Sequence, residues 1–545
     1  MKHIYKLILS ALLAVILAGG CDTSKLHDLN INPNAVNTID MNYFFTAAEL
    51  GSASGGSLGD NRYIDWRTNI GMCAHAIQQF ATAGTGLLVT GDKYIDNDPE
   101  VNAAPFEFWT RDVGRTTAEI LKQTGEGGFD AGNKVNMRNA TRILRVLNFH
   151  RLTDMYGSVP YSEANKGIEG NFFPKYDKQK DIYADLFKEL EEATAALSTS
   201  NPDQGFANAD FIYNGDVTKW KKFGYSLMLR LAMRVSNISA GSALAEEYVT
   251  KAVAGGVFTS NDDNVWVDMA NGPSEWTNQN GISRAMYPGD GGQATLSFLS
   301  NTLIDWLKGT DPESPADDDP RLMIFSGGII DWNSGGITPF PGGLDPVNQK
   351  GMPNGKDQAM LDAEAGAPVP IQSTFSKMNP LLLDDNDPFM LMNVAEVEFL
   401  MAEAIERGIG TVSGTAASHY NAGVKAAMQM YTPFDASLAV SDVAVSTYLD
   451  AYPYGGGTLE DRLEMIGKQL WASHFMNWYE AWSDWRRSGY PHLTPVNYPG
   501  NDTNGQIPTK LRCPVSEVSG NPNYKTGATQ PDEINGVVWW DNGPE

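Results

Sequence analysis

Residues 463–491 read LEMIGKQLWASHFMNWYEAWSDWRRSGYP. Side chains that suit a protein core recur there every three or four positions, which is the period of an amphipathic helix. Asp461 falls in the first turn of the expected helix, where a carboxylate interacts favourably with the helix dipole. The stretch therefore predicts one long helix with a buried face and with its tryptophans in the core. The positions on that face are Leu463, Ile466, Leu470, His474, Trp478, Trp482 and Trp485.

The same period recurs in five other segments, in two blocks of the chain. We expect helices over all of them and a mainly α fold, with helical blocks at about 40–255 and 390–490. The supporting positions are Met137 to Leu147, Tyr183 to Leu197, Trp220 to Ile238, Leu391 to Met401, and Tyr420 to Tyr431.

Residues 255–390 separate the two blocks and differ from them in composition. They hold 13 of the 29 prolines and 17 of the 54 glycines in a quarter of the chain, so proline is nearly twofold enriched. Such residues interrupt regular elements and indicate long loops, where binding functions concentrate. The segment 490–545 is similar. We expect residues 21–545 to form a single domain, because a helical body built from repeated units carries this length as one unit.

The N-terminus has the order of a secretory signal. A short basic region precedes an apolar run, Leu7 to Leu17, that is well below the roughly 20 residues needed to span a bilayer. Small residues then lead directly to Cys21. We expect residues 1–20 to be a cleaved signal peptide and Cys21 to carry lipid; the alternative is an ordinary cleaved signal with an incidental cysteine.

The charge and the cysteine content of the chain limit the partners and the disulfide bonds that we expect. Forty Lys and Arg against 66 Asp and Glu give a formal charge of −26, which repels polyanions, so we do not expect nucleic acid as a partner. After Cys21 only Cys73 and Cys513 remain, too few for a disulfide framework. The sequence leaves open whether these two pair.

No residue pattern requires catalysis, a metal or a cofactor. Gly55-Gly56-Ser57-Leu58-Gly59 fits the G-x-S-x-G elbow, but the residues before it look helical where the elbow needs a strand. The seven histidines are scattered, without metal-ligand spacing. The acidic runs 317–319 and 384–387 lack the EF-hand pattern and are interpreted as solvated turns. A glycosidase pair among the 66 carboxylates is not recognisable from sequence.

Aromatic residues within the loop-rich region have a different context from those on the helices. Polar neighbours such as Asn278, Gln279 and Asn280 accompany them. Aromatic faces cover the C–H face of a pyranose while amides and carboxylates bind its hydroxyls, so this combination suits sugars. The alternative is that the rings fasten loops to the scaffold. The residues are Trp266, Trp276, Tyr287 and Trp332.

Several separated segments carry motifs that occur together in one protein family. The turn YGSVPY at 156–161 is the most specific piece. The others are LNINPN at 29–34, RVLNFHRLTDMYGSVPYSEA at 145–164, NVAEVEFLMAE at 393–403, YNAGV at 420–424, the stretch 466–491, and the closing Arg512-Cys513-Pro514, Glu517 and Asn523-Tyr524. In this order, from Cys21 to nearly the end of the chain, they resemble the SusD/RagB-like outer-membrane lipoproteins.

The resemblance implies tetratricopeptide-like helix pairs, anchorage in the outer membrane, and a SusC-like TonB-dependent transporter as partner. It implies capture of an oligosaccharide, with peptide as the alternative cargo, and no enzymatic activity; a secreted glycosidase is the remote alternative. Trp482, Asp484, Arg486 and Arg487 are then an internal packing and ion-pair element, and Asp484 or Glu480 is the expected acidic partner of a buried arginine.

The ligand site is not carried over by any motif, so our candidates rest on residue type and loop context. We expect stacking or hydrogen bonding from Trp276, Tyr287 and Trp332, joined by Trp66 and Asn61 from an N-terminal loop. Trp109 is interpreted as a packing residue.

Overall fold

Helices occur where five of the six periodic segments predict them. The computed structural model describes residues 39–55, 62–86, 90–200, 202–271, 278–286, 296–333 and 335–545. Polar caps define several of the helix starts: Asp216 accepts backbone N–H groups at the start of α9, and Asn393 does so for α15. The five helices are α6 (Val135–Tyr156), α7 (Gln179–Ala196), α9 (Val217–Arg234), α15 (Val394–Arg407) and α16 (Ala416–Gln429).

The prediction of a single helix through 463–485 is wrong. Two helices occupy the stretch, α18 (Leu459–Ser473) and α19 (Trp478–Ser488), and Met476 between them has a φ of 81°. No glycine or proline marks this break. Tertiary bonds hold it instead, because the Asn477 amide donates to the Leu391 carbonyl and that of Asn393 to the Ser473 carbonyl. Asp461 does lie in the first turn of α18, in a capping box with Thr458.

The described residues contain further elements, most of them short. The remaining α-helices are α3 (Met41–Ala53), α4 (Pro99–Phe108), α5 (Arg115–Thr124), α8 (Phe206–Ala209), α10 (Ser242–Gly255), α11 (Gly281–Met286), α12 (Asn301–Leu307), α13 (Leu322–Phe325), α14 (Gln358–Ala365), α17 (Asp442–Ala451), α20 (Val515–Gly520) and α21 (Tyr524–Gly527). Two segments are π-helical, η1 (Asp65–Ala74) and η3 (Trp109–Gly114). The 3₁₀ turns are η2 (Gly91–Lys93), η4 (Gly167–Glu169), η5 (Asn261–Asp263), η7 (Pro315–Asp317), η8 (Pro346–Asn348), η9 (Ile371–Ser373), η10 (Pro380–Leu382), η11 (Ala436–Leu438) and η12 (Trp539–Asp541).

Strands are few and form two-stranded antiparallel pairs. The pairs are β1 (Phe80–Ala81) with β5 (Phe298–Leu299), β2 (Val159–Pro160) with β3 (Tyr176–Asp177), β4 (Val265–Val267) with β10 (Phe389–Met392), β6 (Ser326–Gly328) with β9 (Lys377–Met378), and β7 (Ile330–Asn333) with β8 (Gly336–Pro339). The β4–β10 pair places Val267 opposite Phe389. It therefore closes the base of the loop-rich region, which leaves the helical scaffold at one point and returns to the same point.

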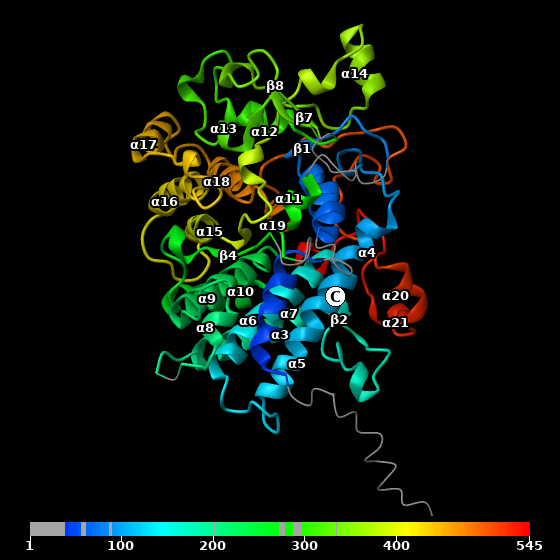
Figure 1. The fold of residues 1–545 in the computed structure, drawn as a ribbon, viewed down its shortest axis with the longest axis vertical. Coiled ribbons are helices and arrows are strands. Elements are labelled where there is room, and N and C mark those ends of the chain that lie inside the picture. The colour runs from blue at the N-terminus through cyan, green and yellow to red at the C-terminus, as the bar shows by residue number, and fades with distance from the viewer. Residues whose placement is uncertain are drawn as a thin grey trace, which may run out of the picture. The chain divides into compact units, whose positions relative to one another are not determined.

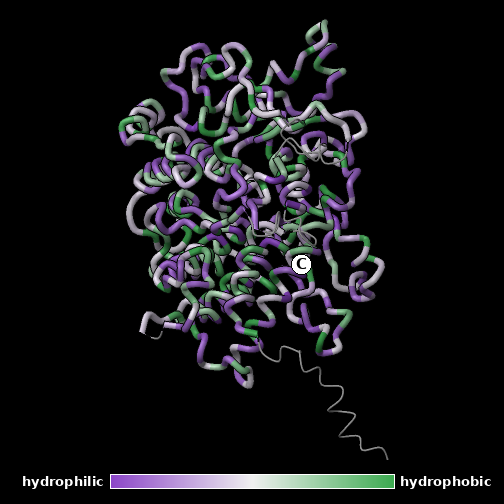
Figure 2. The backbone as a smooth tube through the Cα atoms, viewed as in Figure 1, coloured by the Kyte–Doolittle hydropathy of each residue, from purple (hydrophilic) through white to green (hydrophobic). Residues whose placement is uncertain are grey.

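Consecutive helices pack in pairs, α6 with α7, α9 with α10 and α15 with α16, as the tetratricopeptide-like expectation requires. Residues Met41–Glu545 form one unit, separate from Met1–Asp40. Apolar and polar residues alternate along the helices (Figures 1 and 2), and within the described ranges no helix is both long and apolar enough to cross a bilayer. The fold is mainly α, as predicted.

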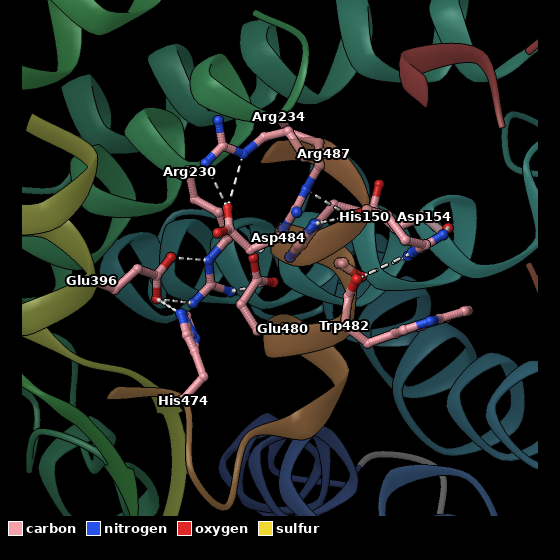
Figure 3. Close-up of polar contacts among 12 residues, drawn as sticks. His150, Asp154, Arg230, Arg234, Glu396, His474, Glu480, Trp482, Asp484 and Arg487 are labelled. Carbon is pink, nitrogen blue, oxygen red and sulfur yellow. Dashed lines mark hydrogen bonds and ion pairs between the residues drawn. The ribbon is translucent and has the colours of Figure 1, made fainter. Parts of the chain in front are cut away.

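Charged side chains are buried where α6, α9, α15 and α19 meet (Figure 3). Arg230 of α9 makes two bonds to Glu396 of α15, of 2.5 and 2.6 Å. Arg234, one turn further along α9, pairs with Glu480 of α19 and lies 3.3 Å from Asp154 of α6. All five side chains are at least nine-tenths buried. One set of ion pairs thus joins four helices that are distant in the sequence.

Residues 482–487, part of the stretch that resembles the SusD/RagB-like family, contribute a second set of buried ion pairs and hydrogen bonds. Arg487 pairs with Asp484 at 2.8 Å and with Glu403 at 2.6 Å, so the expected acid is present. Arg486 differs, because it donates to the carbonyls of Asp154 and Thr509 and its guanidinium lies 3.8 Å from the Trp482 ring centroid. Trp482, His474 and Trp109 are buried as predicted. Cys73 and Cys513 are both buried and unpaired.

Glu403 provides a test of this network. Burial alone would raise the pKa of Glu403, but Arg487 and Arg407 lower it to about 2 from 4.5. Its stabilising contribution is therefore present above pH 4.5 and is lost as the pH falls through 2. Glu403→Gln leaves two arginines short of a charge, and we expect a loss of about 3–5 kcal/mol at neutral pH in chemical denaturation.

The matched control is Glu247→Gln, which removes an exposed partner of Lys251. Exposed pairs contribute about 0–1 kcal/mol, so this variant should unfold almost as the parent does. Equal effects of the two substitutions would contradict the role given to the buried network.

Candidate functional site

Aromatic rings and guanidinium groups lie side by side at the start of η1, in the residues directly before it and at the end of α4. The guanidinium carbon of Arg67 lies 4.7 Å from the ring centroid of Tyr63 and 5.4 Å from that of Trp66, and Arg62 lies 4.8 Å from the Trp66 centroid. Tyr63 in turn packs edge-on against Phe108 of α4 at 5.0 Å. Such cation–π contacts fix the rings in place. We call Arg62, Tyr63, Trp66, Arg67 and Phe108 the aromatic ladder.

Acidic groups at the start of α4 hold the ladder. Arg67 pairs with Asp98 at 2.5 Å and with Glu100 at 2.7 Å, and the Tyr63 hydroxyl also donates to Glu100. Burial and the Glu100 hydrogen bond raise the pKa of Tyr63 to about 12, so its hydroxyl is neutral and keeps its hydrogen. Trp66, Tyr63 and Arg67 remain partly exposed. The ladder therefore offers ordered rings beside polar groups.

The loop-rich region reaches this place through the short helix α11. The Gly281 N–H donates to the Ser54 hydroxyl at 2.9 Å, and a Cβ on Gly281 would lie 2.3 Å from an Asp65 carboxylate oxygen. Only glycine lets α11 come this close to η1. Asp65 is fully buried, and burial raises its pKa to about 7.

An acidic turn, 384–387, borders α11. The Asp385 carbonyl accepts from the Asn280 N–H at 2.7 Å, and the Asp385 carboxylate accepts from the Gln279 amide at 3.1 Å. Ser283 donates to the Asp384 carbonyl. Burial raises the pKa of Asp387 to about 7. The interpretation of this run as a solvated turn holds for Asp384 and Asn386, which are exposed, and is corrected for Asp387, which is buried.

Of the five predicted ligand residues, the structure describes two. Trp66 lies in the aromatic ladder. Trp332, on β7, is only 7% exposed and packs against Ile330 and Leu383, directly before the acidic turn. Its ring therefore fastens a hairpin to the border of α11, which is the alternative weighed for the loop aromatics. Trp266 similarly packs edge-on against Phe434 at 5.6 Å.

Asn61, Trp276 and Tyr287 lie outside the described residues, and so do Cys21 and Ser57. The Gly55 carbonyl accepts from the Ile64 N–H at 3.2 Å, and α11 ends directly before Tyr287. Asn61, Trp276 and Tyr287 remain predicted ligand residues.

The buried charges of Figure 3 do not form an active site. Groups with shifted pKa values often mark catalytic centres, and burial raises the pKa of Glu396 to about 7 and lowers that of His474 to about 3. Both side chains are at most 2% exposed, however, and neither lines the cavities of 280 and 320 Å³. Glu396 is paired with Arg230, and His474 lies 3.7 Å from Glu396. Among the described residues, no cluster of three or more His, Cys, Asp or Glu suits a metal.

Two cavities lie away from the predicted residues. One, of about 320 Å³, borders the YGSVPY turn and includes Arg145, Phe149 and Tyr161. The other, of about 280 Å³, is lined by Trp306 of α12, by Tyr448 of α17 and by residues of α16 and α18. Sequence reasoning missed the second. The only signal was the four-residue spacing of Tyr448 and Tyr452, which places both rings on one face of a helix.

Comparison with known proteins identifies the family. The model of the SusD-like family described as "starch-binding associating with outer membrane" matches residues 66–514. The chain belongs to this SusD-like family. No curated protein sequence matches this SusD-like chain.

Solved structures agree with this SusD-like assignment. A chitin-binding protein is 31% identical, with 92% of this chain and 100% of that chain covered and a TM-score of 0.74. A chitin-binding SusD homologue from Flavobacterium johnsoniae is 25% identical, with 92% and 99% covered and a TM-score of 0.69. A SusD-like protein from Bacteroidetes is 23% identical, with 92% and 100% covered and a TM-score of 0.76, and shares the fold.

Gly281→Ala tests the contact between α11 and η1. The added Cβ would clash with Asp65, which is buried and cannot swing away, so we expect a loss of about 1–3 kcal/mol in chemical denaturation. Gly167→Ala is the control, because its Cβ would meet no atom within 4 Å. A Gly281→Ala protein as stable as the control would mean that the close approach is not required.

Proposed function

We propose that this protein is a surface-exposed lipoprotein that captures an oligosaccharide and delivers it to a partner TonB-dependent transporter in the outer membrane. The observation that carries the proposal is the match of residues 66–514 to a family described as starch-binding and associating with the outer membrane. Two relatives, at 31% and 25% identity, are described as chitin-binding. Starch and chitin are both polymers of pyranose rings.

The chemistry of the face around α11 supports a sugar ligand. Trp66 and Tyr63 supply partly exposed rings, and the C–H face of a pyranose packs on such rings. Arg62 and Arg67 supply guanidinium groups beside these rings. Sugar hydroxyls both donate and accept, so they suit a surface where guanidinium and carboxylate groups lie side by side.

Capture without turnover suits the same chemistry. A retaining or inverting glycosidase needs two carboxyl groups on either side of the scissile bond, one of them able to donate a proton. Asp98 and Glu100, which contact the ladder, are instead ion-paired with Arg67. We therefore propose a non-enzymatic role, in which the protein passes the bound glycan unchanged to the partner transporter.

Binding is tested with the mature chain without lipid. We expect saturable, micromolar-class binding of chito- or malto-oligosaccharides in isothermal titration calorimetry, and at least tenfold weaker binding by Trp66→Ala. Phe172→Ala, which removes a ring that is 74% exposed elsewhere on the chain, is the control and should bind as the parent does. Binding of peptides but of no saccharide would favour the peptide alternative, and release of shortened sugars would contradict the non-enzymatic role.

Cys21 is tested in cells. A lipid-anchored chain should incorporate radioactive palmitate and sediment with outer membranes, because two or more acyl chains anchor a protein stably. Cys21→Ser should lose both properties and be recovered in the soluble fraction. Cys513→Ser is the control, since that thiol is buried and burial raises its pKa to about 12. Palmitate on the Cys21→Ser protein would disprove this anchor.

A further inference from the structure

The cavity beside α17 has the composition of a sugar-binding site, although it is remote from the aromatic ladder. It measures about 280 Å³ and lies among α12, α16, α17, α18 and the loop 309–319. Figure 1 shows α16, α17 and α18 at one side of the fold, away from α4. No residue of the ladder lines this cavity. It is therefore a separate place on the same scaffold.

The walls of the cavity are aromatic, and contacts with other rings and with a guanidinium group hold them in place. Tyr448 and Tyr452 occupy one face of the C-terminal part of α17 and the residue after it, with ring centroids 5.0 Å apart at 42°. Trp306 of α12 lies edge-on to Trp471 at 6.1 Å, and Arg321 lies 5.4 Å from its ring centroid. Trp306 and Tyr452 are partly exposed. Because packing holds these rings in place, a ligand that binds them does not have to order them. The entropic cost of binding is lower for that reason.

The base of the cavity carries ordered polar groups. Gln469 donates to the Tyr448 hydroxyl at 2.8 Å, and its carbonyl oxygen accepts from Arg321 at 2.7 Å. Arg321 is in turn held by Asp319 through two bonds of 2.9 and 2.7 Å. The orientation of the Gln469 amide is thus fixed, and the Tyr448 oxygen acts as an acceptor from it. The hydroxyl hydrogen of Tyr448 remains for a ligand.

Asp317 supplies a charged acceptor at the rim. One of its oxygens accepts from the Thr310 N–H at 2.8 Å and hydroxyl at 2.7 Å, and from the Tyr452 hydroxyl at 2.9 Å. These bonds, the Thr310 hydroxyl foremost, lower the pKa of Asp317 to about 2, so the group is ionised at neutral pH. Its other oxygen is buried and has no hydrogen-bond partner within the described ranges. Lys468 also lines the cavity and contributes a positive charge. Its ammonium group pairs with Glu464 at 3.2 Å.

We infer that this cavity is a second saccharide site, which binds a terminal pyranose ring or disaccharide between Trp306 and Tyr452. Ring faces, an ionised carboxylate, a fixed amide and a hydroxyl donor together match the apolar face and the hydroxyls of a sugar. Pockets for drug-sized ligands hold about 300–1,000 Å³, so the volume suits one or two rings better than a long chain. The class of ligand rests on the proposed function, whereas the position of the site does not.

Two sites on one molecule would retain a long glycan more strongly than either alone. When one part of a chain is bound, a second part is held at high effective concentration near the other site. A polymer that reaches both sites should therefore gain avidity, whereas a disaccharide should not. This difference separates a second functional site from a cavity that merely accepts small sugars.

The test uses the whole mature chain labelled with 5-fluorotryptophan. Loss of one fluorine resonance in Trp306→Phe assigns Trp306, and loss of another in Trp66→Phe assigns Trp66. Chito- and malto-oligosaccharides, from disaccharide to hexasaccharide, are then titrated. We expect a saturable shift of the Trp306 resonance that persists in Trp66→Ala and weakens at least fivefold in Tyr452→Ala.

Tyr43→Ala is the matched control for Tyr452→Ala, because Tyr43 is 74% exposed and lies on α3. Tyr452→Phe keeps the ring but removes the bond to Asp317, and should weaken the shift less than Tyr452→Ala does. A Trp306 resonance that is unmoved by sugars that shift Trp66 would overturn the second site and leave the proposed function intact. Sugars that shift neither resonance would overturn both.

Discussion

Arg230 and Arg234 on α9 set the arrangement of the helices, because each must reach a carboxylate on another part of the chain. Their partners come from α6, α15 and α19, namely Asp154, Glu396 and Glu480. A buried charge without its partner costs several kcal/mol, so only the packing that brings all four helices together satisfies both arginines. Replacing such pairs with apolar residues can leave stability unchanged; the role of the network is to exclude other packings of the same helices.

The same ion pairs, together with burial, fix the charge states of Glu480 and His474. Burial alone would raise the pKa of Glu480, yet Arg230 and Arg234 lower it below its ordinary value, so the carboxylate stays charged. His474 has its pKa lowered to about 3 by burial and stays neutral. A general acid or base must exchange its proton near the working pH and must reach a substrate. These two side chains do neither, and they act as fixed elements of the scaffold.

Sequence periodicity predicted the helices well because their apolar faces and caps are local properties. The side chains of Asn393 and Thr458 accept backbone N–H groups from the first turn of their own helices, so these caps can be recognised from the local sequence alone. The break at 474–477 has no such local mark. Met476 adopts a positive φ because Asn477 and Asn393 bond across the fold, between residues 86 and 80 positions apart in the chain. Such a break becomes visible only when the distant partners are placed.

The candidate site divides in the same way. Trp66 could be selected from its type and loop context, but the arginines that order it, Arg62 and Arg67, gained meaning only with their distances to its ring. Trp332 met the same selection rule and lies buried under Leu383, because aromatic residues in loops both bind ligands and fasten loops. The Trp306 cavity could not be predicted at all, since α12 and α17 are about 140 positions apart and only their packing creates it.

The helical scaffold holds the two proposed sugar-binding surfaces apart. The β4–β10 pair closes the base of the loop-rich region, so its loops are displayed without disturbing the helix pairs. α11 leaves that region and docks on η1 through Gly281, which ties the loops to the aromatic ladder. Because α12 leaves the same region towards α17, one excursion of the chain contributes to both the ladder face and the distant cavity. The affinity of a glycan that contacts both places would depend on the span between them.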